Sequence, residues 1–254
     1  MAGTANRGVA WVTGAGTGIG RGIARRLAED GWSVAVSART ARDLDSLAAE
    51  VPGRITAFQL DVTDPKAADD TGRRIEADLG PVDLAVLNAG SYFPTNARSF
   101  SVDNFRKTVD LNLMGTVNCM GPIVPSMVGR RSGHIAIMGS QSAFSGLPTA
   151  ASYGATKAAL NSMAEAFKPD FDRYGVAITI INPGFVKTPL TAKNRFPMPF
   201  LMELDDAVEI ILRGLEQRRF AINFPWQMTL STKLLAALPG WAKFAITRKM
   251  LPKE

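Results

Sequence analysis

The sequence contains a single cysteine, Cys119, and a single histidine, His134, among its 254 residues. One cysteine cannot form an intrachain disulfide, and such scarcity fits a reducing compartment. Structural zinc sites use four ligands of the Cys and His type, and zinc-dependent alcohol dehydrogenases rely on similar ligands. The sequence therefore excludes an intrachain disulfide framework and predicts no metal site.

Long apolar runs are also absent. No uncharged stretch approaches the ~18 residues of a membrane span. The segment Met1–Arg7 lacks the apolar core of a signal peptide. Linkers, repeats and low-complexity segments are not visible either. Because 46% of the residues are hydrophobic, a large core can form without a disulfide or a metal. We therefore expect one soluble, cytoplasmic domain.

The net charge of +6 is concentrated at one end of the chain. Residues 226–254 carry +4, from Lys233, Lys243, Arg248, Lys249 and Lys253 against Glu254, so the rest of the chain carries only +2. This distribution argues against a nucleic-acid-binding body. Residues 1–225 are predicted to form the main domain, and residues 226–254 a basic, amphipathic C-terminal extension.

Short runs rich in Val, Ile and Ala alternate with helical patterns. Consecutive apolar positions are typical of strands that helices cover on both faces. The spacing fits βα units, and therefore a single-domain α/β fold with a doubly wound, Rossmann-type parallel sheet of about seven strands. Such sheets bind ligands at the carboxyl ends of their strands. The predicted strands are Val9–Thr13, Ser33–Ala38, Ile55–Leu60, Asp83–Asn88, His134–Gly139, Val176–Asn182 and Phe220–Phe224.

A glycine-rich segment follows the first predicted strand. It reads Thr13-Gly14-Ala15-Gly16-Thr17-Gly18-Ile19-Gly20 and opens a helix that contains Ile23, Ala24 and Leu27. Glycines let a pyrophosphate approach the backbone N–H groups, and a helix N-terminus favours its negative charge. The third glycine of the common Gly-x-Gly-x-x-Gly pattern is missing, because Ile19 stands in its place. A dinucleotide site is favoured over an ordinary glycine-rich turn.

The second predicted strand ends in Ala38-Arg39. Proteins of this fold that prefer NAD usually place an acidic residue here, on the ribose 2′-hydroxyl. Arg39 can pair with a 2′-phosphate instead, so NADP(H) is favoured over NAD(H). The alternative is a solvated arginine at a strand end. The glycine loop itself has Thr17 where many NADP-preferring relatives carry a basic residue.

Tyr153 and Lys157 stand four residues apart in a helical segment and therefore share one helix face. A phenol with a pKa of about 10 is a poor acid or base near neutrality. A neighbouring ammonium lowers that pKa, so the pair suggests a tuned proton donor and acceptor. Asn112 lies on the inward stripe of a predicted helix, Val102–Met120, with Phe105, Val109, Thr116 and Met120, and it requires hydrogen-bond partners there.

These motifs, in this order over about residues 9–188, resemble the short-chain dehydrogenase/reductase family. Further motifs carry the resemblance: Asn88-Ala89-Gly90 follows the fourth predicted strand, and Pro183-Gly184-Phe185-Val186-Lys187-Thr188 follows the sixth. Ser140 stands thirteen residues before Tyr153, which is the family's usual separation for the catalytic serine, and Ser142 is the second candidate for that role. The resemblance implies hydride transfer between a nicotinamide and a carbonyl or alcohol, with Ser140, Tyr153, Lys157 and Asn112 as the catalytic residues. The implied cofactor contacts are Gly14, Gly16, Thr17, Gly18, Ile19, Gly20, Arg39, Asp61, Val62, Asn88, Ala89, Gly90, Tyr153, Lys157, Pro183, Gly184, Val186 and Thr188.

Alternatives remain at the level of function. An epimerase or dehydratase of the same fold, or a silent nucleotide-sensing protein, would share the nucleotide site. A Ser-His-Asp hydrolase is disfavoured, because His134 has no established acid partner. We expect a small carbonyl or alcohol substrate, no nucleic acid partner, and a homo-oligomer, either a dimer or a tetramer.

Two segments bear on specificity. Residues 188–204 are predicted to form a lid over a hydrophobic substrate, because the segment is apolar and Met-rich from Arg195 onward. The alternative is a loop that packs on its own body. The extension places Leu230, Leu234, Leu235 and Leu238 on one predicted stripe. It could pack on the body, lie on an anionic membrane, cross a subunit interface or cover the substrate cleft.

Overall fold

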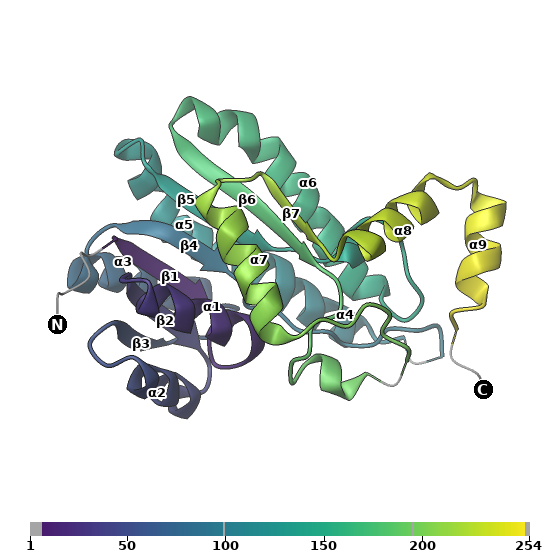
Figure 1. The fold of residues 1–254 in the computed structure, drawn as a ribbon, viewed down its shortest axis with the longest axis horizontal. Coiled ribbons are helices and arrows are strands. Elements are labelled where there is room, and N and C mark those ends of the chain that lie inside the picture. Colours follow the sequence, from purple (N-terminus) through teal and green to yellow (C-terminus); the bar gives the residue numbers. More distant parts are fainter. Residues whose placement is uncertain (1–6, 99, 195, 252–254) are drawn as a thin grey trace.

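The computed structural model describes residues 7–98, 100–194 and 196–251, and these form a three-layered α/β fold (Figure 1). Seven parallel strands make one sheet in the order β3-β2-β1-β4-β5-β6-β7. The chain starts in the middle of the sheet, builds outward to β3, and then crosses back to β4. The strands are β1 (Val9–Thr13), β2 (Ser33–Ala38), β3 (Ile55–Gln59), β4 (Val82–Leu87), β5 (Gly133–Met138), β6 (Val176–Pro183) and β7 (Ala221–Phe224).

Helices cover both faces of the sheet, so each face has its own apolar core. One core contains helix side chains such as Ile23, Leu44 and Ile211 together with Val12 of β1. The other contains Ile75, Ile123 and Leu160 together with Ile135 of β5. The helices are α1 (Gly18–Glu29), α2 (Ala41–Glu50), α3 (Pro65–Leu79), α4 (Val102–Val109), α5 (Gly115–Gly129), α6 (Ala151–Arg173), α7 (Leu204–Glu216), α8 (Trp226–Ala237) and α9 (Gly240–Arg248).

The predicted fold class and all seven predicted strands are confirmed. The bounds of β1 and β2 agree with the prediction, β3, β6 and β7 differ by one residue at one end, and β4 and β5 are shifted by one residue at both ends. Leu60, for example, lies just beyond β3, although its N–H still bonds the carbonyl oxygen of Ala38 at 3.0 Å. Strand ends fray, and a boundary one residue away follows from that.

The predicted helix Val102–Met120 is interrupted in its middle. The segment Asp110–Met114 forms one π-helical turn between α4 and α5. Asn112, Thr116 and Met120 are buried as predicted, whereas Phe105 and Val109 are only half-buried. A π turn contains one residue more than an α turn and often occurs at a functional site. The regular inward stripe is therefore broken at the residue that the sequence singles out.

The described residues contain no helix long and apolar enough to cross a membrane.

The carboxyl ends of the parallel strands all lie at one edge of the sheet. Because β1 lies between β2 and β4, the connections after β1 and β4 leave the sheet in opposite directions. A crevice is expected where they diverge.

Candidate functional site

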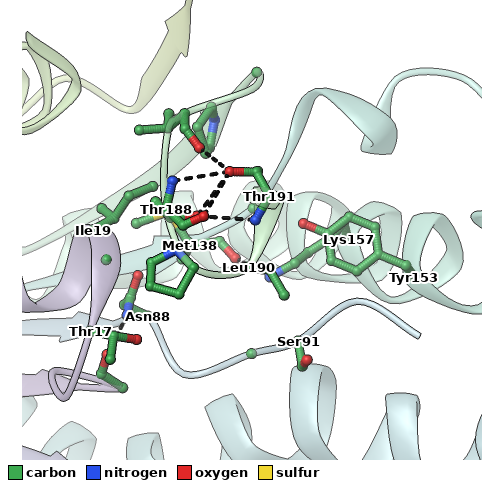
Figure 2. Close-up of a pocket in the computed structure, with 18 residues that line it drawn as sticks. Thr17, Ile19, Asn88, Ser91, Met138, Tyr153, Lys157, Thr188, Leu190 and Thr191 are labelled. Atoms are coloured by element: carbon green, nitrogen blue, oxygen red, sulfur yellow. Dashed lines mark hydrogen bonds between the residues drawn. The ribbon is translucent and has the colours of Figure 1, made fainter. Parts of the chain in front are cut away.

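A cavity of about 190 Å³ lies at the carboxyl ends of β1, β4, β5 and β6. It collects segments that are far apart in the sequence but converge at this edge of the sheet (Figure 2). Among the residues proposed from the sequence, those on its wall are Gly14, Thr17, Gly18, Ile19, Asn88, Gly90, Tyr153, Lys157, Pro183, Gly184, Val186 and Thr188.

The glycine loop requires glycine at two of its positions for steric reasons. Gly14 has a φ of +64°, and a Cβ added there would lie 2.8 Å from the Cα of Ala89. A Cβ added at Gly20 would lie 2.5 Å from the carbonyl oxygen of Gly14. Both distances are shorter than real Cβ contacts, so the backbone approaches itself closely here. Any larger residue would force the loop open.

The N-terminus of α1 faces the cavity without a side-chain cap. Thr17 is the N-cap residue, but its side chain accepts no hydrogen bond from the helix, and the first turn holds no acidic residue. The first N–H groups of a helix lack intrahelical partners and carry partial positive charge. This end of α1 therefore fits the pyrophosphate of a dinucleotide, which would accept hydrogen bonds from those groups.

Asn88 and Thr13 join the glycine loop to the end of β4. The Asn88 Nδ2 donates to the carbonyl oxygens of Thr13 and Gly14, at 3.0 and 3.1 Å. The Thr13 hydroxyl accepts hydrogen bonds from the backbone N–H groups of Asn88 and Ala89. Ala89 thus lies behind the cavity wall and supports it through its backbone, while Gly20 packs against Asn88 from the other side.

Tyr153 and Lys157 lie side by side on α6 and extend toward the cavity (Figure 2). Burial raises the pKa of the Tyr153 phenol above its usual value, and a hydrogen bond with Ser140 acts in the opposite direction. The Tyr92 ring meets the Tyr153 ring edge-on, with 5.4 Å between centroids. The phenol is therefore held in place and carries its proton at neutral pH.

Lys157 is almost completely buried, with 3% of its surface exposed. Its Nζ donates a 2.6 Å hydrogen bond to the carbonyl oxygen of Met138 and lies 5.6 Å from the centroid of the Tyr153 ring. Burial disfavours the charged form and lowers the pKa of Lys157 to about 8. The ammonium thus persists at neutral pH, but the predicted lowering of the Tyr153 pKa is wrong, because burial raises that pKa instead.

Ser140 and Ser142 form a pair rather than two independent candidates. The Ser142 hydroxyl donates to the Ser140 Oγ at 3.0 Å, and the Ser142 N–H donates to the same atom at 3.2 Å. The Ser140 N–H in turn bonds the Oδ1 of Asn182 at 2.9 Å. Ser142 therefore orients the serine that bonds Tyr153, and Ser140 remains the candidate of choice.

Asn112 lies in the π turn behind the cavity and is fully buried. Its amide group forms a reciprocal pair with the backbone of Ser91: the Oδ1 accepts at 2.8 Å and the Nδ2 donates at 2.9 Å. The Nδ2 also lies 3.3 Å from the Thr156 hydroxyl on α6. The predicted hydrogen-bond partners are thus present, and they connect the segment after β4 to the helix that carries Tyr153.

The segment after β6 closes the cavity on the side opposite Ser91. The Thr191 hydroxyl donates to the carbonyl oxygen of Val186 at 2.6 Å and accepts from the Thr188 N–H at 3.0 Å. Backbone hydrogen bonds then tie residues 185–187 to Met202. Exposed apolar side chains mark the predicted lid, namely Leu190, Phe196, Phe200 and Leu201. Arg195, also in that segment, lies outside the described residues.

Six of the proposed cofactor contacts lie off the cavity wall, namely Ala89, described above, and five others. Arg39 is exposed at the end of β2, where its carbonyl oxygen accepts from Gln59. Asp61 is exposed and folds into a turn, its Oδ1 accepting from Thr63. Val62 is buried beneath it. Gly16 is held from below by Arg21, which donates to its carbonyl oxygen at 3.2 Å. The fifth, Gly20, packs under the loop.

His134 lies at the opposite end of β5 from Ser140. Its Nε2 lies 2.7 Å from the Thr179 hydroxyl, and burial lowers its pKa to about 4. This position agrees with a structural role. No group of three or more His, Cys, Asp or Glu side chains that could hold a metal occurs within the described part of the chain.

Several residues of the site escaped sequence reasoning. Met138 acts through a backbone oxygen, which leaves no signature in the sequence. Ser91 directly follows Asn88-Ala89-Gly90, and Thr191 follows Thr188 by three residues, so proximity to a motif was the available signal. Gln141 follows Ser140 and is buried, with its Nε2 donating to the Thr229 hydroxyl on α8 at 2.6 Å.

Comparisons with known proteins agree with this geometry. The model of the short chain dehydrogenase family matches residues 8–198. An uncharacterized oxidoreductase of Myxococcus xanthus is 38% identical over 95% of this chain and 96% of its own length. One of Staphylococcus epidermidis is 31% identical over 82% of this chain and 91% of its own.

Two solved structures share the fold. A short-chain dehydrogenase from Streptomyces avermitilis has a TM-score of 0.82 and 24% identity, over 94% of this chain and 97% of its own. A variant of actinorhodin polyketide ketoreductase, solved with NADPH, has a TM-score of 0.81 and 23% identity, over 90% of this chain and 99% of its own. The chain is therefore an oxidoreductase that belongs to the short-chain dehydrogenase/reductase family.

Proposed function

We propose that this protein transfers a hydride between NADP(H) and a carbonyl or alcohol substrate. The observation that carries the proposal is the convergence of Tyr153, Lys157 and the glycine loop on one cavity, with Ser140 bonded to Tyr153 behind it. Members of the family bind a nicotinamide cofactor, which supplies the hydride or accepts it. The glycine loop and the uncapped end of α1 fit its pyrophosphate.

Tyr153 acts as the general acid in reduction and as the general base in oxidation. Its raised pKa keeps the phenol protonated at neutral pH, so the proton needed by a nascent alkoxide is present. The raised pKa thus favours the reductive direction near neutrality. Positioned proton transfer of this kind is worth about 10²–10⁴-fold in rate.

Ser140, Lys157 and Asn112 support that step. The Ser140 hydroxyl holds the substrate oxygen beside the phenol, and Ser142 fixes the orientation of Ser140. Lys157 places a positive charge next to the phenol and favours its ionised form when the proton leaves. Asn112 positions the segment after β4 against α6 and so sets the distance across the site.

Arg39 supports a preference for NADP(H). It stands at the end of β2, next to the glycine loop, and its side chain forms no ion pair within the described residues. A guanidinium pairs well with a phosphate dianion, and position 38, where NAD-preferring proteins of this fold place an acid, holds an alanine. NADPH in the actinorhodin ketoreductase structure is compatible with this preference.

The substrate is proposed to be hydrophobic. Leu190 lines the cavity, and Phe196, Phe200 and Leu201 are exposed in the same segment, residues 188–204. Exposed apolar side chains grouped at the mouth of a cavity are typical of a ligand-binding surface. The segment is proposed to close over an apolar carbonyl compound as a lid.

A panel of carbonyl and alcohol compounds, assayed by nicotinamide absorbance with NADPH and NADH, tests this function. We expect turnover of apolar ketones or aldehydes with NADPH. Tyr153→Phe is expected to abolish turnover while NADPH binding, followed by its fluorescence, persists. Near-normal turnover in that variant would exclude Tyr153 as the acid. An epimerase or dehydratase, or a silent sensor, would bind the nucleotide but give no net absorbance change.

A further inference from the structure

The two C-terminal helices expose an apolar surface that the proposed chemistry does not use. We name as the tail surface the exposed side chains of residues 226–251. The apolar ones are Trp226, Leu230, Leu234, Leu238, Trp241, Phe244, Ile246, Met250 and Leu251. Trp226 and Trp241 are 69% and 80% exposed. Isolated apolar residues are common on protein surfaces, but a group with two exposed tryptophans marks an interaction site.

Helix α8 is apolar on two opposite faces. Its inner face buries Met228, Thr232 and Leu235 against the body. Trp226, Leu230 and Leu234, spaced by four residues, form the outer face and are exposed. The stripe predicted from the sequence is therefore wrong at Leu235, which is buried against the body. The other members of that stripe, Leu230, Leu234 and Leu238, are exposed. A helix needs only one apolar face to pack on its own domain, so the outer face is available for something else.

Helix α9 stands away from the body, at the opposite end of the molecule from α3 (Figure 1). It contains no buried residue. An open hollow of about 420 Å³ separates it from the loop at residues 146–148, with Phe244 and Arg248 on the helix side. Packing of the extension on its own body thus holds for the inner face of α8, whereas α9 has no fully buried residue.

The charge of the tail surface has one sign only. Residues 226–251 contain Lys233, Lys243, Arg248 and Lys249 and no acidic residue. None of these four cations forms an ion pair within the described residues, and Lys233 lies over the Phe144 ring at 5.3 Å. Most other helices pair their basic residues with acidic ones, as Lys66 does with Asp70 on α3. An anionic partner would complement this surface along its full length.

We propose that the tail surface docks on an anionic lipid bilayer. Exposed tryptophans favour the boundary between headgroups and acyl chains, where the ring is apolar and its N–H can still bond. Basic side chains beside an apolar face favour anionic lipids, each by about fivefold in partitioning. A symmetric contact between two tail surfaces would bring like charges together, so a second copy fits less well.

Sedimentation with vesicles tests the proposal on the full-length protein. We expect binding to vesicles of phosphatidylcholine and phosphatidylglycerol at about 2:1, little binding to phosphatidylcholine alone, and weakening by salt. Trp241→Ser with Phe244→Ser should lower the partition coefficient at least about tenfold, since both side chains insert. Lys243→Glu with Arg248→Glu should lower it at least as much.

Matched controls keep the test specific. Tyr174→Ser changes an exposed aromatic residue at the far end of α6, and Lys66→Glu with Arg73→Glu repeats the charge reversal on α3. Both controls should bind vesicles like the unchanged protein. The tail-surface variants should keep the thermal midpoint of the unchanged protein, because none of the replaced side chains is buried. The Lys66→Glu with Arg73→Glu control loses two exposed ion pairs and should show a small drop in the midpoint.

Two results would overturn the proposal. One is the failure of the unchanged protein to sediment with anionic vesicles, or its equal binding to neutral ones. The other is a drop in oligomeric mass for Trp241→Ser with Phe244→Ser, measured by light scattering without lipid, which would assign the surface to a second copy. Neither result depends on the reaction at the cavity, so dehydrogenase activity and lipid docking can fail separately.

Discussion

Lys157 donates a hydrogen bond from its Nζ to the carbonyl oxygen of Met138, the last residue of β5, at 2.6 Å. This bond joins the middle of α6 to the carboxyl end of the central sheet. It also holds a buried ammonium beside the cavity, where burial lowers its pKa to about 8. The site thus contains a buried charge whose desolvation costs stability.

Lys157→Met is expected to stabilise the protein at pH 7 while it abolishes catalysis. The lowered pKa of Lys157 corresponds to a desolvation cost of about 3 kcal/mol, which the variant removes. The variant also loses the hydrogen bond to Met138, which stabilises the folded state by about 1 kcal/mol. The net gain in the free energy of unfolding is therefore about 2 kcal/mol, measurable by urea denaturation.

The stability difference between Lys157→Met and the unchanged protein is expected to depend on pH. Between pH 8 and 10.5 the folded state loses the Lys157 proton before the unfolded state does, so the unchanged protein gains stability as the pH rises. The advantage of Lys157→Met should shrink over that range. A constant advantage would contradict the lowered pKa.

Arg39→Asp is expected to reverse the nucleotide preference. The change removes a partner for the 2′-phosphate and places a carboxylate where it would repel one, so kcat/KM for NADPH should fall by about 10–100-fold. The value for NADH should hold or rise. Arg42→Asp makes the same change in charge three residues later and should have a smaller effect. Equal losses of kcat/KM for NADPH in both variants would indicate a general effect of the changed charge rather than a specific contact between Arg39 and the 2′-phosphate.

Asn112→Ala should cost both stability and activity. It removes two hydrogen bonds to the Ser91 backbone and leaves buried polar groups unpaired, at a cost of about 2–3 kcal/mol. Turnover should fall further than the loss of folded protein explains. Asn118→Ala, on the same helical stretch, breaks only one bond to Val62 and should retain activity. Equal kcat values for the two variants would remove Asn112 from the site.

Gln141→Leu is expected to loosen α8. The buried amide bonds the Thr229 hydroxyl, accepts from the Thr232 hydroxyl at 3.1 Å, and lies beside Ser140. We expect a loss of about 2–3 kcal/mol in stability and faster hydrogen exchange in α8. Gln217→Leu, at an exposed position, is the control. Unchanged exchange in α8 would show that the apolar contacts of Met228 and Leu235 hold the helix without the amide.

The sequence predicted the sheet well, because strands such as Val9–Thr13 are apolar runs bounded by glycine or turn residues. It also predicted most of the cavity wall, since each motif follows a strand and parallel strands end together. The π turn at Asp110–Met114 was missed because an inserted residue changes the backbone and not the apolar pattern. The direction of Leu235 was missed because α8 is apolar on both faces, so periodicity could not choose between them.

The pairing of Asn88 with the glycine loop has a consequence for how the protein is made. The glycine loop is held by hydrogen bonds from Asn88, which lies about 75 positions later in the chain than Thr13. Strand β1 also gains its second neighbouring strand only when β4 docks. A nascent chain that has emerged only as far as α3 therefore has the loop but not its final shape. Nucleotide binding during synthesis would report the moment at which the chain crosses back over the sheet.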